Sequence, residues 1–311
     1  MRIASVLTPI TESHLRLAAQ IGVTDIVGRY PGSSDYESLL DLKKQIESAG
    51  LQLSVIEGHV PMRQIVLGLD GTDDEIENIQ NLIRNMGKLE IPLLTYNFMA
   101  TGDMSRTSFT TPDRGGALVS SFDDSKMEDA PPENRATSEV LWGRLRNLLE
   151  QVVPVAEESG VKLAMHPDDP PMSKFRGSDQ IMSTKADYEK LVELVESESN
   201  GICLCQGCFS EMGEDVSACI RTLGQNIVYA HFRDVNGCVP KFQETFHDCG
   251  QTDMPETVRA YKEIGFDGPA RPDHVPLIEG EHGEAKGYTM LGRLFAVGYM
   301  RGLIQAAYGN Y

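Results

Sequence analysis

The sequence of 311 residues predicts an α/β protein, a (β/α)8 TIM barrel formed by a single domain over residues 1–311. Three observations predict this fold. Short apolar runs alternate strictly with longer segments of helical periodicity, which is the pattern of repeated βα units around a parallel sheet. Several helical segments end in glycine, as helices that close with a left-handed residue do. The length also suits a barrel, because barrels of about this size commonly fold as one unit.

The expected strands are short runs rich in β-branched or other apolar residues, as strands covered on both faces are. In chain order they are residues 2–7 (RIASVL), 24–29 (TDIVGR), 51–58 (LQLSVIEG), 91–98 (IPLLTYNF), 161–167 (VKLAMHP), 201–207 (GICLCQG), 226–235 (NIVYAHFRDV) and 268–274 (GPARPDH).

The expected helices follow these strands one by one and repeat their apolar residues at helical spacing. They are residues 12–22, 36–50, 74–90, 139–160, 185–199, 214–224, 254–265 and 288–308. Glycines at left-handed helix ends are expected at Gly22, Gly50, Gly160, Gly224 and Gly265. A doubly wound open sheet is the alternative, but no G-x-G-x-x-G motif follows the first strand.

Two connections are longer than barrel closure requires, at about 99–135 and 236–251. Both follow a strand, so we expect them as extended loops on the C-terminal face of the barrel. The first is rich in Ser, Thr, Asp, Gly and Pro and has no sustained period. We therefore expect it to be a lid or a disordered insertion.

The composition excludes several classes of partner. The net charge of −18 disfavours binding to nucleic acid or to an anionic membrane, because like charges repel. The sequence contains neither an apolar run of about 18 residues nor a signal-peptide pattern, which predicts a cytoplasmic protein. All six cysteines lie between residues 203 and 249, and we expect reduced thiols. The run CLCQGC lacks the second half of a zinc knuckle.

Residues able to bind a metal recur where the later strands end. His166, Cys205, His231 and Asp273 follow four consecutive expected strands. In a barrel these ends converge on one face. Taken singly, each residue has another interpretation: His166 could cap a turn, Cys205 could be a buried thiol and His231 a core histidine. Together, two imidazoles, a thiolate and a carboxylate predict a divalent metal site with open coordination positions.

The stretch ARPDHVP (270–276) places Asp273 beside His274 between two prolines. The prolines restrict the backbone, and Asp273 is the expected carboxylate ligand. His274 then points elsewhere because side chains alternate along a strand. An imidazole held near a cation is a candidate for proton transfer.

Several segments together resemble the mannonate dehydratase family, a branch of the xylose-isomerase-like TIM barrels. They are AAQIGVTDIVG (18–28), HPDDPP (166–171), CQGCFSEMG (205–213), HFRDV (231–235), FQETFHDCGQTDM (242–254), RPDHVP (271–276) and GYTMLGRLFAVGYMRGL (287–303). The resemblance implies a hydro-lyase that dehydrates D-mannonate to 2-keto-3-deoxy-D-gluconate in hexuronate catabolism, as a homodimer that uses Mn2+. It implies the metal ligands His166, Cys205, His231 and Asp273, with proton transfer by His274 and Tyr288.

Other residues in these motifs are candidates for substrate binding. Arg233 and Arg271 could hold the substrate carboxylate through a guanidinium fork, or could form ion pairs within the acidic barrel rim. Glu244 and His247 are expected at the pocket. Asp168, Asp169 and Glu244 are also candidates to hold the ligating histidines.

Several alternatives stay open at the level of sequence. The donor set suits Fe2+, zinc or another divalent metal as well as manganese. Cys249 and Gln251 differ from the SGDTDM segment common in the family, so a related sugar acid is a possible substrate. A metal-dependent sugar isomerase or epimerase on the same fold, or a sugar-acid binding protein without catalysis, are the other functions considered.

Overall fold

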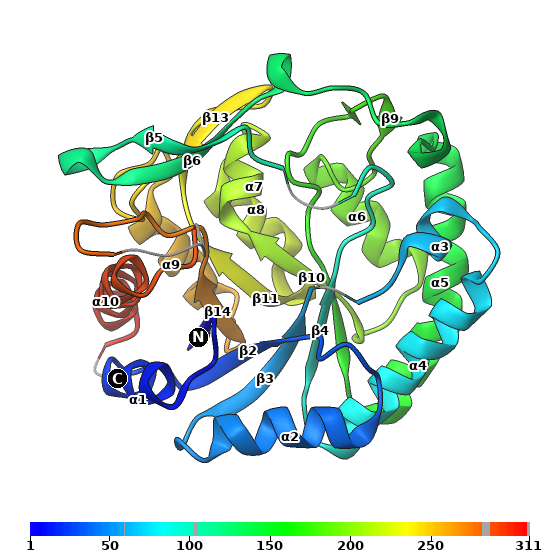
Figure 1. Ribbon diagram of the computed structural model, residues 1–311, viewed down its shortest axis with the longest axis horizontal. Coiled ribbons are helices and arrows are strands. Elements are labelled where there is room, and N and C mark those ends of the chain that lie inside the picture. Colours follow the sequence, from blue (N-terminus) through cyan, green and yellow to red (C-terminus); the bar gives the residue numbers. More distant parts are fainter. Residues whose placement is uncertain (59, 103–104, 282–286, 310–311) are drawn as a thin grey trace.

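The computed structural model describes residues 1–58, 60–102, 105–281 and 287–309, and its centre is a closed barrel of parallel strands (Figure 1). In spatial order the barrel strands are β1 (Arg2–Val6), β14 (Pro269–Pro272), β11 (Ile227–Phe232), β10 (Asn200–Cys205), β7 (Lys162–Met165), β4 (Leu93–Tyr96), β3 (Gln52–Glu57) and β2 (Asp25–Arg29). Pairing of β1 with β14 closes the barrel and rules out an open sheet. All eight expected strands are therefore confirmed.

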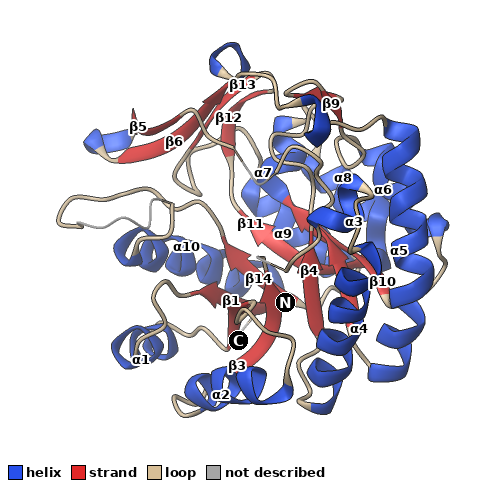
Figure 2. Ribbon diagram, turned by 45° about the vertical axis from the view of Figure 1, so that its right-hand side comes forward, coloured by secondary structure: helices blue, strands red, loops and turns tan. Residues whose placement is uncertain are grey.

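The helices form a ring outside the strands (Figure 2). The eight expected ones are α1 (Glu12–Gln20), α2 (Tyr36–Glu47), α4 (Thr72–Lys88), α5 (Ser138–Ser159), α6 (Lys185–Leu194), α8 (Val216–Leu223), α9 (Met254–Glu263) and α10 (Met290–Tyr308). Two short helices were not expected, α3 (Arg63–Leu67) and α7 (Gln206–Glu211). No helix among the described residues is long and apolar enough to cross a membrane.

Local signals set the helix ends. Thr184 and Asp187 form a capping box at the start of α6, which satisfies amide groups that the first turn leaves free. Gly160 ends α5 with φ 67°, a conformation that glycine adopts without steric cost. The other glycines expected at helix ends also have positive φ.

The alternation of side chains along each strand divides the core into two parts. One face of the strands fills the barrel interior with residues such as Val27, Val55 and Tyr229. The other face, which includes Ile26 and Leu94, packs against the helices in the larger cluster. Near the carboxyl ends of the strands the inward-facing residues are polar. The candidate site described below lies at this end of the barrel.

The described residues of the two long connections form regular structure, so of the two alternatives expected for 99–135 the disordered insertion is wrong. Strands β5 (Ser108–Pro112) and β6 (Leu118–Asp123) from the first pair with β12 (Val235–Cys238) and β13 (Lys241–Glu244) from the second. In Figure 2 this four-stranded antiparallel sheet lies above the barrel strands. Phe122 stacks on Phe242 with ring centroids 5.5 Å apart, which gives the sheet its own apolar core.

Short elements complete the described chain. They are β8 (Lys174–Phe175), β9 (Ser178–Asp179) and the 3-10 turns η1 (Arg114–Gly116), η2 (Asp124–Lys126), η3 (Pro132–Asn134) and η4 (Gly224–Asn226).

Candidate active site and metal centre

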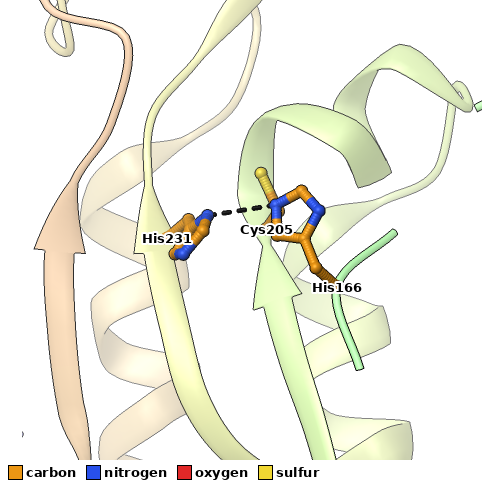
Figure 3. A group of neighbouring side chains, drawn as sticks. All are labelled: His166, Cys205 and His231. Carbon is orange, nitrogen blue, oxygen red and sulfur yellow. Dashed lines mark hydrogen bonds between the residues drawn. The ribbon is translucent and has the colours of Figure 1, made fainter. Parts of the chain in front are cut away.

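Three of the expected metal ligands meet at the carboxyl ends of adjacent strands. The side chains of His166, Cys205 and His231 are buried, and one ligand atom from each lies within 4.8 Å of the others (Figure 3). Register explains the meeting, since Cys205 of β10 pairs with His231 of β11. His166 follows directly after β7, the other neighbour of β10.

Hydrogen bonds to the outer ring nitrogens orient the two imidazoles. Nδ1 of His166 lies 2.8 Å from the carbonyl oxygen of Pro167, and Nε2 of His231 lies 3.1 Å from a carboxylate oxygen of Glu57. Both partners can only accept, so these outer nitrogens carry the hydrogens. The inner nitrogens then present lone pairs to each other at 3.1 Å.

Two facing lone pairs repel each other, so a cation held between the nitrogens, either an added proton or a metal ion, would stabilise this arrangement. Burial and Arg271 disfavour a charged ring, yet Cys203 and Glu57 raise the pKa of His231 well above its usual value. A proton or a divalent cation could occupy the space between Nε2 of His166 and Nδ1 of His231. The orientation of both rings therefore fits a metal centre, as the donor chemistry does.

Asp273 presents one carboxylate oxygen to this centre. Its Oδ1 accepts hydrogen bonds from Arg271 at 2.6 Å and from the Tyr288 hydroxyl at 3.0 Å. Its Oδ2 lies 3.5 Å from Nδ1 of His231. Burial opposes ionisation, but Arg271 and His274 hold the pKa of Asp273 well below its usual range. The low pKa keeps the carboxylate ionised, and one of its oxygens lies beside His231; Asp273 is not among the three residues whose ligand atoms lie within 4.8 Å of one another.

The Cys205 thiol is set up as a thiolate. Burial would raise its pKa, but hydrogen bonding with Cys208 and the charge of Arg233 hold the pKa well below the usual value. Nε of Arg233 lies 3.3 Å from the sulfur of Cys205. A thiolate is the form that binds metals.

His274 and Tyr288 also adjoin the Asp273 carboxylate. The ring centroids of His274 and Tyr288 are 5.7 Å apart, and Nε2 of His274 is 3.7 Å from Oδ2 of Asp273. Burial lowers the pKa of His274, while burial and Asp273 raise that of Tyr288 to about 12. At neutral pH the pair is a neutral imidazole beside a protonated phenol, one able to accept a proton and the other to donate one.

Comparison with known proteins agrees with this geometry. A model of the family described as D-mannonate dehydratase (UxuA) matches residues 9–138 and 133–310 of the chain. The chain belongs to this family. The resemblance expected from the sequence motifs is therefore confirmed.

Relatives from several bacteria match most of the chain. A mannonate dehydratase of Thermotoga neapolitana is 36% identical over 309 residues, which cover 87% of this chain and 85% of the relative. A mannonate dehydratase of Oceanobacillus iheyensis is 34% identical over 298 residues, which cover 86% of this chain and 85% of the relative.

Solved structures give the same result. The crystal structure of mannonate dehydratase from Streptococcus suis serotype 2 matches with a TM-score of 0.91 and 32% identity, over 99% of this chain and 95% of that one. The D-psicose 3-epimerase of Clostridium cellulolyticum H10 matches with a TM-score of 0.64 and 15% identity, over 98% of this chain and 99% of that one. At this identity the match shows a shared fold alone.

The two arginines considered for substrate binding use their guanidinium groups inside the protein. Arg271 forms a fork with Glu57 at 2.7 and 3.0 Å and also binds Asp273. Arg233 donates to Glu211, Glu244 and Asp169 at 2.6 to 3.0 Å, and neither arginine is more than 1% exposed. The geometry matches the ion-pair alternative for both.

A second group of potential ligands is filled by one of these arginines. Asp169, Cys208 and Glu211 also bring ligand atoms within 4.8 Å of one another. The guanidinium of Arg233 donates to all three. This group therefore already contains a cation, and the same arginine also contacts Cys205 of the candidate metal centre.

The remaining candidates divide between the site and its surroundings. Nδ1 of His274 lies 3.4 Å from Oε1 of Glu244, so Glu244 adjoins the pair expected to transfer protons. His247 is fully buried, and its ring stacks on Phe232 at 5.9 Å, on the face of β11 that packs against the helices. The expected pocket-lining role of His247 finds no support in this geometry.

Two residues of the site were missed at the level of sequence. Glu57 ends β3 and binds His231, Tyr229 and Arg271. Its position at a strand end was a signal that could have revealed it. Arg106 lies in the long insertion and forms a fork with Asp169 at 2.6 and 3.0 Å. No local sequence pattern marks Arg106, because its partners come from other parts of the chain.

Proposed function

We propose that this protein removes water from D-mannonate and forms 2-keto-3-deoxy-D-gluconate, with a divalent metal held by His166, Cys205, His231 and Asp273. The observation that carries the proposal is the position of Asp273. One of its oxygens lies 3.5 Å from Nδ1 of His231 while the other accepts from Tyr288, so the proposed ligand group and the proposed proton-transfer pair share one carboxylate.

The chemistry requires two opposite proton movements on neighbouring carbons. The C2 proton of an aldonate is very weakly acidic because the adjacent carboxylate is already charged. A bound divalent cation supplies electrophilic stabilisation for the charge that develops as this proton leaves. His274 then needs a free ring nitrogen near C2, and Tyr288 needs its proton near the C3 hydroxyl.

We assign the base to His274 and the acid to Tyr288. Nε2 of His274 has no hydrogen-bond partner within the described chain, so its lone pair is available to take the C2 proton. The Tyr288 hydroxyl keeps its proton while it donates to Asp273. Transfer of that proton lets the C3 hydroxyl leave as water, and the resulting enol tautomerises to the keto acid.

Manganese is the metal we propose, on the basis of the family resemblance. The donor set also suits iron(II) and zinc, because imidazole and thiolate bind each of them. We also propose a homodimer. One chain has a mass of 34.3 kDa, and light scattering on the purified protein would then give twice that value.

The test is an anaerobic assay of the manganese-reconstituted protein on a panel of aldonates, with 2-keto-3-deoxy acid and metal content measured together. We expect product from D-mannonate and none from its C2 epimer, D-gluconate. Bound metal without keto acid from any aldonate would overturn the proposal. An isomerase or epimerase would instead leave the substrate composition unchanged.

A further inference from the structure

A cavity of about 390 Å³ opens beside the carboxyl ends of β3 and β4. Thr95, Tyr96 and Asn97 line it from the end of β4, and Gly58 does so from the end of β3. The outer part is lined by Met62 and Arg63 at the start of α3 and by residues of the 99–135 insertion, including Thr101 and Asn134. The size is in the range of small-molecule sites.

The inner end of this cavity adjoins the metal centre. Thr95 pairs with Glu57 in the barrel register, and the alternation of β4 turns both side chains toward the interior. Glu57 binds His231, and the carbonyl oxygen of Tyr96 accepts from the amide of His166 at 2.8 Å. The cavity wall therefore bonds directly to the backbone of His166 through Tyr96, and Glu57 links it to His231.

The cavity lies across the barrel from the proton-transfer pair. His274 follows β14, and in the closed barrel β3 is three strands from β14 by way of β1 and β2. In the other direction β4 is four strands away, by way of β11, β10 and β7. A six-carbon acid whose C2 and C3 lie at His274 has a short carboxyl end and a longer tail. Only the tail, C4 to C6, is long enough to extend toward β3 and β4.

The lining suits neutral hydroxyl groups. No aspartate, glutamate or lysine lines the cavity among the described residues, and its one charged side chain, Arg63, binds Asn134 at 2.8 Å. Thr95 is 3% exposed, and its hydroxyl has no hydrogen-bond partner within the described residues. Hydroxyl and amide groups both donate and accept, as a polyol requires.

We propose that the β3/β4 cavity binds the C4–C6 hydroxyl groups of the substrate, and that Thr95 and Asn97 determine its chain length. This inference rests on the proposed dehydration of an aldonate. Thr95 lies nearer the metal centre and contacts the inner part of the tail. Asn97, two residues further along, contacts its end.

The test compares D-mannonate with D-lyxonate, which has the same configuration from C2 to C4 but lacks C6. Manganese-reconstituted wild type, Thr95→Val and Asn97→Leu are assayed with both acids. We expect Thr95→Val to raise KM about ten-fold for both, because a buried hydroxyl contact is lost. Asn97→Leu should bring the ratio of kcat/KM for the two acids from at least about ten to near one. Thr257→Val, at a buried threonine of α9, is the matched control.

Binding separates this inference from the proposed reaction. Calorimetry with D-mannonate and D-lyxonate uses the same variants in a His274→Asn background, so that substrate is not consumed. We expect D-mannonate to bind more tightly than D-lyxonate, and Asn97→Leu to remove this difference. That result would support binding of the substrate tail in the cavity even if no aldonate is dehydrated. Unchanged KM, affinity and substrate ratio in both cavity variants, with metal content and Tm as in wild type, would overturn it.

Discussion

His274 has a backbone φ of 49°, a left-handed conformation that few residues other than glycine and asparagine adopt. Pro272 precedes it by two positions and Pro276 follows by two, and the amide of Val275 donates to Gly287 at 2.8 Å. These constraints hold the ring beside Asp273 and Glu244 rather than in solvent. The two prolines of ARPDHVP thus serve to aim the imidazole.

Replacement of His274 by asparagine tests its role with little change to the backbone, because asparagine tolerates positive φ. We expect turnover of D-mannonate to fall about 10²- to 10⁴-fold through loss of the base. Bound metal, measured by elemental analysis, should stay near that of wild type. His14→Asn on α1 is a control at a histidine far along the chain from the site. More than a tenth of wild-type turnover in His274→Asn would contradict the assignment.

Asp234 is a buried carboxylate outside the ligand set whose titration should be visible in stability. It accepts from the amides of Val235 and Thr252, both at 2.8 Å, yet burial raises its pKa to about 6. The unfolded value is about 3.9. Between these values the folded state binds more protons, so the free energy of unfolding contributed by Asp234 is present below about pH 4 and lost as pH rises through about 6.

The expected size of this effect is at most about 3 kcal/mol, from a shift of about two pKa units. Urea unfolding of wild type and Asp234→Asn from pH 4 to pH 7 measures it as the change in their difference. The constant part of that difference reports the lost acceptor and is not part of the prediction. A difference that does not vary with pH would show that Asp234 has an ordinary pKa.

At the scale of elements, the inserted sheet is tied to the barrel by a buried arginine. Arg106 precedes β5, and its side chain is 3% exposed. It binds Asp169, which follows β7, and Glu244 of β13 at 2.6 Å. Its guanidinium carbon also lies 5.0 Å from the centre of the Phe242 ring. One side chain therefore connects both insertions to the loop that carries His166.

Arg106→Met should reduce the free energy of unfolding by about 3–5 kcal/mol, because it leaves buried carboxylates without a cation. Arg114→Gln on the same insertion is the matched control. Its partner is Asp248 and its side chain is 46% exposed, so we expect a loss of about 1 kcal/mol or less. Urea unfolding compares the two. Equal losses of unfolding free energy in the two variants would show that the buried ion pairs of Arg106 stabilise the protein no more than the exposed pair of Arg114.

Replacement of two helical glycines by alanine should change the stability of the protein in opposite directions. Gly143 of α5 is exposed, and a Cβ there would meet open space. Gly143→Ala should stabilise by about 0.5–1 kcal/mol through helix propensity. A Cβ on Gly87 of α4 would collide with the carbonyl oxygen of Ser159 at the end of α5.

Gly87→Ala should therefore destabilise by about 1–3 kcal/mol in spite of the gain in propensity. Thermal unfolding of the two variants beside wild type measures both signs. A rise in Tm for Gly87→Ala, like the rise expected for Gly143→Ala, would contradict the close contact between α4 and α5 at Gly87.

At the scale of the whole molecule, metal binding should stabilise the fold, because the proposed ligands come from four strand ends that are assembled only in the folded state. Free metal at about a hundred times its Kd adds about 2.7 kcal/mol. Chelation should therefore lower Tm, and added Mn2+ should restore it. Cys205→Ser should bind metal at least about ten-fold more weakly, because a serine hydroxyl does not ionise as the thiol does.

Elemental analysis and thermal unfolding of both proteins, with and without chelator, check this expectation. A wild type that contains metal but shows the same Tm after the metal is removed would contradict it. A Cys205→Ser protein with wild-type affinity would remove the thiolate from the ligand set.

Much of this molecule follows from the sequence, because its signals are local. The alternation of strands and helices predicted the barrel. Once strand ends are assumed to converge, His166, Cys205, His231 and Asp273 predict one centre. The structure brings ligand atoms of the first three within 4.8 Å of one another and places an oxygen of Asp273 3.5 Å from Nδ1 of His231. The helix ends were also predictable, since a capping residue or a glycine acts within one turn.

Only the tertiary structure decided what depends on contacts between distant segments. The 99–135 insertion forms strands because 235–244 supplies their partners. Arg106 is buried because Glu244, 138 residues later, neutralises it. Glu57 belongs to the site because barrel closure brings it to His231, 174 residues away. A strand edge or a charge has no stable partner until the fold supplies one, and no periodicity in the sequence records which partner that is.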